Sequence, residues 1–236
     1  MKEIEKIEFV NYTKTEEILN STTHIFGAVL AIIATIMTVV RSLSIGRNDY
    51  LAIGLVYCLS MLLVFSCSSV YHGLPRSRAK KFMRMVDYTA IYFMLMGTIT
   101  PYMLLSVAKI NHKLGWTLFT ICLVATVISI ILTLTAFSRT KAIRMVLYVV
   151  IGACAFSSLF ILGDKINQVA GTYILFGNWV YNIPGTYAII GNGAYILGLV
   201  LFAIGSKKKY FHTIFHVLII AGATIHFINL YKHVFV

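Results

Sequence analysis

Histidine is the residue type in this sequence with the most chemistry to offer, and three of its seven copies have a spacing that suits a metal. His212 and His216 are four residues apart, which on a helix places both imidazoles on one face about 6 Å apart. His72 could add a third nitrogen ligand and leave the fourth tetrahedral position of Zn²⁺ to a water molecule. We therefore predict a zinc site formed by His72, His212 and His216.

A carboxylate and a hydroxyl accompany these histidines. Asp87 is the one acid of the eight that falls inside an apolar segment, where ionisable groups are costly and are therefore candidates for function. Two plainer interpretations stay open: Ser68 could bond a carbonyl of its own helix, and the His212 and His216 pair could belong to an interfacial aromatic belt. We predict Asp87 and Ser68 as catalytic residues, because Asp87 could orient or deprotonate a metal-bound water and Ser68, one turn before His72, could hydrogen-bond that water or a substrate oxygen.

The sequence defines the roles of two further histidines less clearly. His226 follows His216 by ten residues, about 15 Å along a helix, which is too far for the same ion, so we predict a hydrogen-bonded packing residue. His24 could make a hydrogen bond at the start of its helix or contribute to the pocket. Thr13-x-x-Glu16 can cap a helix start, after which Glu16, Asn20 and His24 repeat at every fourth residue. That stripe is either part of the site or an exposed polar face.

The elements that must position these residues are membrane-spanning helices. The chain is 59% hydrophobic and 12% charged, with a mean hydropathy of +0.85, which is too apolar for a soluble domain of 236 residues. A spanning helix needs about 20 mainly apolar residues. We predict an all-α polytopic membrane protein in which an N-terminal arm, 1–23, partly helical, precedes a domain, 24–236, with seven spans: 24–43, 51–72, 84–105, 114–136, 143–162, 186–205 and 211–231.

Two further predictions concern the polar segment before the sixth span and the cysteines. The segment from Asp164 to Pro184 is predicted to be an external loop, with an interfacial helix anchored by Trp179 and Tyr181. The four cysteines fall inside spans without a CxxC pair, so we predict packing residues and no disulfide framework.

The distribution of Lys and Arg predicts the orientation of the bundle. With seven spans, fourteen of the twenty cations fall on the side of the N-terminal arm and six on the other side. Since the more basic side faces the cytoplasm, the N-terminus is predicted inside and the C-terminus outside. This orientation brings His72, Asp87, His212 and His216 to the cytoplasmic leaflet. The net charge of +12 lies in short loops and matches anionic lipid headgroups, so nucleic acid is not an expected partner.

Several motifs in a fixed order resemble the hemolysin III family, the bacterial branch of the progestin and adipoQ receptor family. The resemblance covers nearly the whole chain, and it rests on Glu16, Asn20, Thr23, His24 and Gly27; SSVYH at 68–72; Arg84-x-x-Asp87; TPY at 100–102; GNGAYILG at 191–198; and FHTIFHVLIIAGATIHF at 211–227. One departure is Phe215, where the family usually has tryptophan within HxxxH.

The resemblance implies a seven-helix fold with a cytoplasmic N-terminus. In the related adiponectin receptors, zinc is held by the histidine of SxxxH and both histidines of HxxxH, with an aspartate near the bound water. Carried over by motif, these positions are His72, His212, His216 and Asp87, with Ser68 as the matching serine. The wider superfamily includes alkaline ceramidases, which favours hydrolysis of a lipid amide, whereas the bacterial members take their name from a cytolytic activity.

The leading hypothesis is a Zn²⁺-dependent intramembrane hydrolase of a lipid amide or ester that enters sideways from the inner leaflet. Asp87 would be its general base. Membrane lipids are the expected partners, with a lipid substrate or free fatty acid inside the bundle. One alternative is a pore-forming cytolytic protein or a sensor of bilayer state with structural zinc, and a third is a transporter or proton pathway built on His226 and His24.

Overall fold

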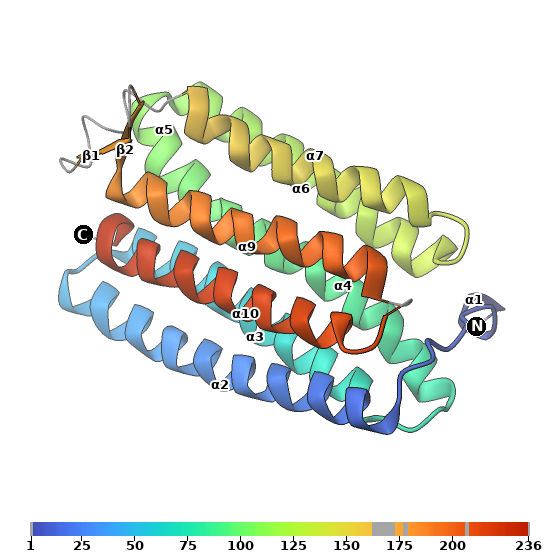
Figure 1. Cartoon of the computed structure of the whole chain (residues 1–236). Helices are drawn as coiled ribbons and strands as arrows, with labels where there is room; N and C mark the ends of the chain where they lie inside the picture. The colour runs from blue at the N-terminus through green and yellow to red at the C-terminus, as the bar shows by residue number, and fades with distance from the viewer. Residues whose placement is uncertain (1, 162–172, 177–178, 206–207, 236) are drawn as a thin grey trace.

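Seven long helices form one bundle in a computed structural model of the chain, which describes residues 2–161, 173–176, 179–205 and 208–235. The N- and C-termini lie at opposite ends of this bundle (Figure 1). The long helices are α2 (Lys14–Ser44), α3 (Asn48–Gly73), α4 (Arg78–Pro101), α6 (His112–Ala136), α7 (Lys141–Ile161), α9 (Ile183–Gly205) and α10 (Phe211–Asn229). Short helices are α1 (Lys2–Glu5) and α5 (Ala108–Ile110), and π-helical segments are Tyr102–Val107 and Leu230–Val234.

These helices occupy the seven predicted places, and the protein is a polytopic membrane protein. Six described stretches are long and apolar enough to cross a membrane: 14–44, 48–73, 78–110, 112–136, 186–203 and 211–234. Helix α7 has 21 residues and covers the predicted fifth span up to residue 161; that it crosses the membrane stays a prediction. Large apolar side chains such as Phe26, Val40, Val124 and Val146 are exposed on the outside of the bundle, which suits contact with lipid. All four cysteines lie in the described part of the chain, and none of them forms a disulfide.

The predicted interfacial helix at Trp179 and Tyr181 is wrong. Residues Trp179–Asn182 form strand β2, which pairs antiparallel with β1 (Tyr173–Phe176) so that Phe176 faces Trp179. Aromatic and branched side chains fill both segments, and such residues favour strands over helices. The part of the predicted loop at 164–172 lies outside the described residues.

Helix α2 begins ten residues before the predicted span because of its cap. The Glu16 amide donates to Thr13 Oγ1 at 3.2 Å, while Glu16 Oε2 accepts from the Thr13 amide at 2.9 Å. This is the capping box that Thr13-x-x-Glu16 predicts, and it satisfies amides that the first helical turn leaves without partners. The helix therefore extends the stripe of Glu16, Asn20 and His24 into the structured part of the bundle.

The third spanning stretch runs from Arg78 to Ile110, longer than the predicted 84–105. Ser77 caps its start by accepting from the Lys80 amide at 3.2 Å. Pro101 lies inside it and lacks an amide hydrogen, and the backbone continues beyond it in the wider π-helical segment Tyr102–Val107.

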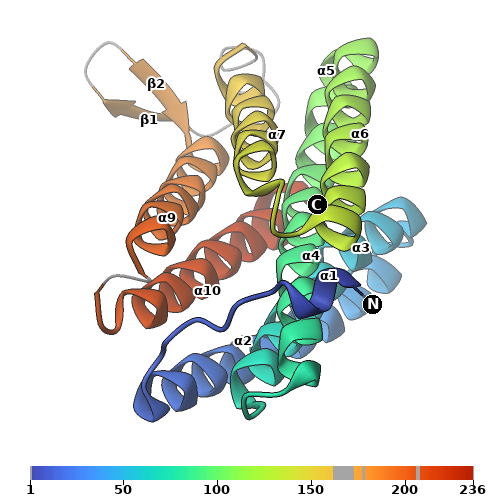
Figure 2. The same ribbon diagram turned by 90° about the vertical axis from the view of Figure 1, so that its right-hand side faces the viewer.

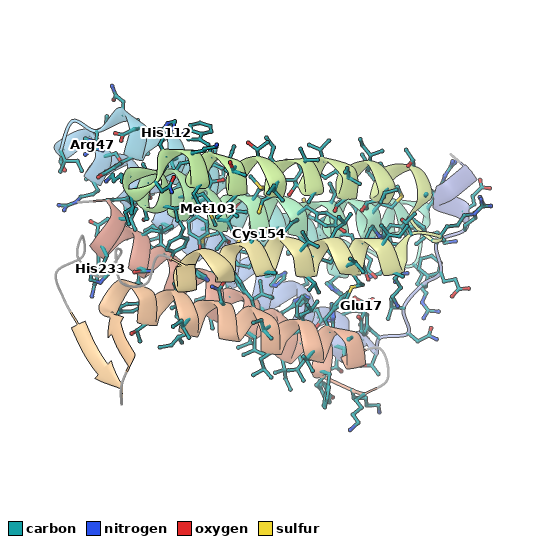
Figure 3. All side chains as sticks on the ribbon, turned by 90° about the horizontal axis from the view of Figure 1, so that it is seen from above. Glu17, Arg47, Met103, His112, Cys154 and His233 are labelled. Atoms are coloured by element: carbon teal, nitrogen blue, oxygen red, sulfur yellow. The ribbon has the colours of Figure 1, made fainter. Side chains whose placement is uncertain are left out.

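Helices α2, α3, α4 and α10 meet where the N-terminal arm crosses the bundle. Helix α3 packs between α2 and α4, and α10 packs against α2 and α9. Figure 2 shows the arm running across this end of the bundle from α1 to α2. Figure 3 places Glu17 at this end and Arg47, His112 and His233 at the other. The end of α3 and the starts of α2, α4 and α10 are therefore neighbours, although they lie far apart in sequence.

Candidate metal centre

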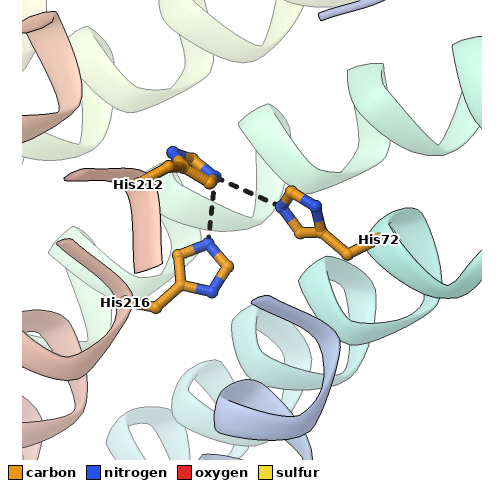
Figure 4. Close-up of side chains that lie close together, drawn as sticks. All are labelled: His72, His212 and His216. Carbon is orange, nitrogen blue, oxygen red and sulfur yellow. Dashed lines mark hydrogen bonds between the residues drawn. The ribbon is translucent and has the colours of Figure 1, made fainter. Parts of the chain in front are cut away.

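The imidazoles of His72, His212 and His216 converge inside this end of the bundle (Figure 4). One nitrogen of each ring lies within 4.8 Å of the others, an arrangement that could hold a metal ion. His212 Nε2 is 3.2 Å from His72 Nε2 and 3.1 Å from His216 Nε2. All three residues are buried, with exposed fractions of 2%, 6% and 1% in sequence order. A lipid-facing aromatic belt would leave His212 and His216 exposed, so that interpretation is wrong.

Hydrogen bonds at Nδ1 fix which nitrogen two of these rings present. His72 Nδ1 lies 2.7 Å from Glu17 Oε2, and His216 Nδ1 lies 3.1 Å from the Asn20 carbonyl oxygen. An ionised carboxylate and a carbonyl oxygen only accept, so both Nδ1 atoms donate and both Nε2 atoms keep a lone pair. A single proton on His212 Nε2 could satisfy only one of those lone pairs, whereas a metal ion binds all three nitrogens. The donor set therefore fits a nitrogen-bound metal.

Helix α2 also holds the start of α10, which carries two of the three histidines. Glu16 Oε1 accepts from the Tyr210 amide at 2.8 Å, and Tyr210 has the left-handed φ of 64° that turns the chain into α10. The Asn20 side-chain oxygen accepts from the Thr213 hydroxyl at 2.6 Å. The stripe predicted on α2 is thus buried against α10 and is not an exposed polar face.

Asp87 and Ser68 lie beside the three histidines rather than among them. Asp87 is buried on α4, next to Ser68, which is buried on α3. Ser68 and His72 share one face of α3 at a spacing of four residues, so Asp87, next to Ser68, lies about one helical turn from the level of His72. Asp87 does not belong to the group that could hold a metal. The catalytic roles of Asp87 and Ser68 stay predictions.

The two remaining buried histidines have different surroundings. His226 is 1% exposed, and its Nδ1 is hydrogen-bonded to the Tyr102 hydroxyl at 3.1 Å, which matches a hydrogen-bonded packing residue. His24 stacks face to face on His216, with ring centroids 3.7 Å apart and an angle of 11°. Neither His24 nitrogen has a hydrogen-bond partner among the described residues, so His24 does not make the hydrogen bond expected at a helix start.

Sequence reasoning missed Glu17, Lys80 and Tyr12. The first two form an ion pair of 2.9 Å beside His72. Tyr12 stacks on His212 with centroids 4.9 Å apart, and burial raises the pKa of its phenol, so the hydroxyl stays protonated. Glu17 is adjacent to the capping box, and a helix that starts at Lys14 would bring it to the depth of His72; that pattern could have pointed to it.

The N-terminal arm closes the bundle end over the metal centre. Ile7 is buried against Met85 and Phe137, and the Lys81 ammonium donates to the Glu5 carbonyl at 3.1 Å. Tyr12 then lies across His212, with its ring centroid 5.6 Å from that of His72. The direct route from the cytoplasmic side of the predicted topology to the imidazoles is thus covered by protein.

Apolar spans around a buried cluster of three imidazoles define the class: a multi-pass membrane protein with an internal site able to hold a metal ion. A sequence profile of the family described as "Haemolysin-III related" matches residues 12–227, and the chain belongs to this family. Two curated relatives agree. "Hemolysin-3" of Bacillus cereus is 25% identical over 223 residues, 94% of each chain, and "Hemolysin-3 homolog" of Bacillus subtilis (strain 168) is 30% identical over 110 residues, 47% of this chain and 50% of that relative. The cell membrane is the location that family and spans support.

Proposed function

We propose that this protein is a zinc-dependent intramembrane hydrolase that cleaves an amide or ester bond of a membrane lipid. The observation that carries the proposal is the convergence of the Nε2 atoms of His72, His212 and His216 inside an apolar bundle, with the buried carboxylate of Asp87 on α4, which packs against α3. Three imidazoles are the ligand set that leaves zinc an open coordination position.

The three histidines would hold Zn²⁺. When bound, the ion would supply Lewis acidity, which polarises a substrate carbonyl and makes water a stronger acid. Asp87 would accept the proton that water loses as its oxygen attacks the carbonyl carbon, and would pass that proton to the leaving nitrogen or oxygen as the single bond between that atom and the carbonyl carbon breaks. Ser68, next to the Asp87 carboxylate, would help to keep it in place. The products would be a fatty acid and an amine or alcohol.

A lipid substrate would approach through the bilayer. The arm and Tyr12 cover the end of the bundle above the imidazoles, while apolar residues cover its sides. An acyl chain lying between helices would lose little on entering from lipid, because both environments are apolar. This route fits a lipid amide or ester better than a polar substrate.

Metal analysis tests the centre directly. We expect the purified full-length protein to carry about one zinc ion per chain, and the variants His72→Ala and His212→Ala to lose it, because each removes one of three nitrogen ligands. His226→Ala is the matched control, since it removes a buried histidine outside the ligand group and should keep the zinc. Full zinc content in both ligand variants would end the proposal.

Turnover and leakage separate this function from its alternative. The names of the two relatives point to hemolysis, which suggests a pore-forming protein with structural zinc as the second candidate. Purified protein would be incubated with labelled ceramide-like and ester lipids and, separately, with dye-loaded liposomes. Lipid cleavage that Asp87→Ala abolishes supports the hydrolase, whereas dye leakage unaffected by that change supports the pore.

A further inference from the structure

Glu17 joins three helices at the metal centre. Its Oε2 accepts from His72 Nδ1 at 2.7 Å, and its Oε1 lies 2.9 Å from the Lys80 ammonium. The residues come from α2, α3 and α4. The side chains of His72 and Lys80 are almost fully buried, with exposed fractions of 0% and 5%, and that of Glu17 is 21% exposed. Burying a charged pair removes both charges from water, and the attraction between them offsets that cost only where the geometry of the pair is good.

The carboxylate determines which nitrogen His72 can offer to a metal. Without a partner, a neutral imidazole carries its proton on either nitrogen. An acceptor 2.7 Å from Nδ1 holds the proton there, which leaves the Nε2 lone pair facing His212 Nε2 at 3.2 Å. It also fixes the orientation of the ring. Carboxylates bound to the second nitrogen of a ligating histidine play this part in metal sites generally.

Lys80 holds the carboxylate in position. Besides Glu17, its ammonium donates to the carbonyl oxygens of His72 at 3.3 Å and Leu74 at 2.9 Å. These carbonyls lie in the last turn of α3 and at its C-cap, Leu74, where helical carbonyls lack partners. Lys80 therefore ties the carboxylate of Glu17 to the end of the same helix that carries His72.

We propose that Glu17 is a positioning residue of the metal centre, which presents His72 through Nε2, and that Lys80 anchors Glu17 for this purpose. The inference rests on the proposed zinc centre and deepens it. It adds a ligand-orienting residue from α2, a helix that supplies no ligand. The competing explanation is that the ion pair between Glu17 and Lys80 only stabilises the packing of α2 against α4.

Zinc affinity of the detergent-purified full-length protein, measured by competition with a chelator, tests the inference. We expect Glu17→Ala to weaken zinc binding about 10- to 100-fold, the usual effect of removing a ligand's hydrogen-bond partner. Glu17→Gln should recover part of that loss, since its amide oxygen still accepts from Nδ1. Asp49→Asn is the matched control: it neutralises an ion-paired acid in the first turn of α3, at the opposite end of the bundle, and should leave affinity unchanged.

Combining the variants with His72→Ala distinguishes positioning from packing. If Glu17 acts through His72, then Glu17→Ala causes no further loss of zinc affinity once His72 is absent. An equal loss in both backgrounds would overturn the inference and leave a packing role. Where the residual affinity without His72 is too weak to measure, the comparison of Glu17→Gln with Glu17→Ala decides: equal losses contradict the hydrogen-bond role.

Failure of the zinc centre and failure of the Glu17 role give different results. A wild-type protein that binds no zinc overturns both. A wild-type protein that binds zinc, and loses it in His72→Ala but keeps full affinity in Glu17→Ala, overturns only the role of Glu17.

Discussion

His24 is the residue whose surroundings are hardest to explain by packing alone. It is 3% exposed, stacks on His216 and contacts the Phe65 ring edge-on, yet neither of its nitrogens has a partner among the described residues. A buried polar group without a partner costs about 1–3 kcal/mol. The cost is unnecessary in a pure packing position, which leucine would fill. In the proposed hydrolase, one His24 nitrogen would serve a polar group of the substrate next to His216.

Replacing His24 by leucine tests this inference. We expect His24→Leu to keep its zinc, because His24 lies outside the ligand group, and to melt at the same temperature as wild type or higher, because no hydrogen bond is lost. Under the proposed function, hydrolysis of a lipid substrate should fall, mainly through a raised KM. Thermal denaturation in detergent, metal analysis and kinetics measure the three effects.

His226→Leu is the matched control for that experiment. It removes a histidine that is equally buried but bonded to the Tyr102 hydroxyl, and should lower stability by about 1 kcal/mol, the usual contribution of one hydrogen bond. Loss of zinc from His24→Leu would instead make His24 a ligand, and a lowered melting temperature would give it a structural role.

At the scale of elements, the site depends on how closely α3 approaches α4, since α3 carries Ser68 and His72 and α4 carries Asp87. Gly97 of α4 allows this approach. A Cβ at Gly97 would overlap Ser60 Oγ and would lie 3.2 Å from the Val56 carbonyl oxygen, so no larger residue fits without moving the helices apart. Small residues at such crossings let membrane helices pack tightly.

Gly97→Ala is therefore expected to destabilise the protein by about 1–3 kcal/mol, the usual cost of overpacking. Gly152→Ala is the comparison, because a Cβ at Gly152 meets nothing within 4 Å, and alanine favours the helix. The melting temperatures of both variants in detergent provide the measurement. Equal melting temperatures for the two alanine variants would contradict this prediction. They would show that α3 and α4 accommodate a methyl group at Gly97 without loss of stability.

At the scale of the whole molecule, the sequence predicts the helices and the meeting of three histidines. It does not predict the side-chain contacts between helices. Apolar length places the spans, and alternating direction brings His72, His212 and His216 to one depth. Glu17 falls in the predicted N-terminal arm, and the capping box predicts where α2 starts but not that its first turns pack on α3. The contact of Tyr12 with His212 depends on the packing of the arm against the bundle, which no local sequence pattern predicts. The hairpin at Trp179 replaced an expected helix because interfacial aromatic residues occur in both.

The orientation of the bundle in the membrane is the remaining prediction at this scale. The termini lie at opposite ends (Figure 1), and Glu17, which contacts His72 of the candidate metal centre, lies at the N-terminal end (Figure 3). Fourteen cations on that side predict that it faces the cytoplasm. Ala79 and Ser44 are exposed at the two ends and can each be changed to cysteine, and the four native cysteines lie within helices. In intact cells, a membrane-impermeant maleimide should label Ser44→Cys, while Ala79→Cys should react only after permeabilisation. The reverse pattern would place the metal centre in the outer leaflet and require the lipid substrate to come from there.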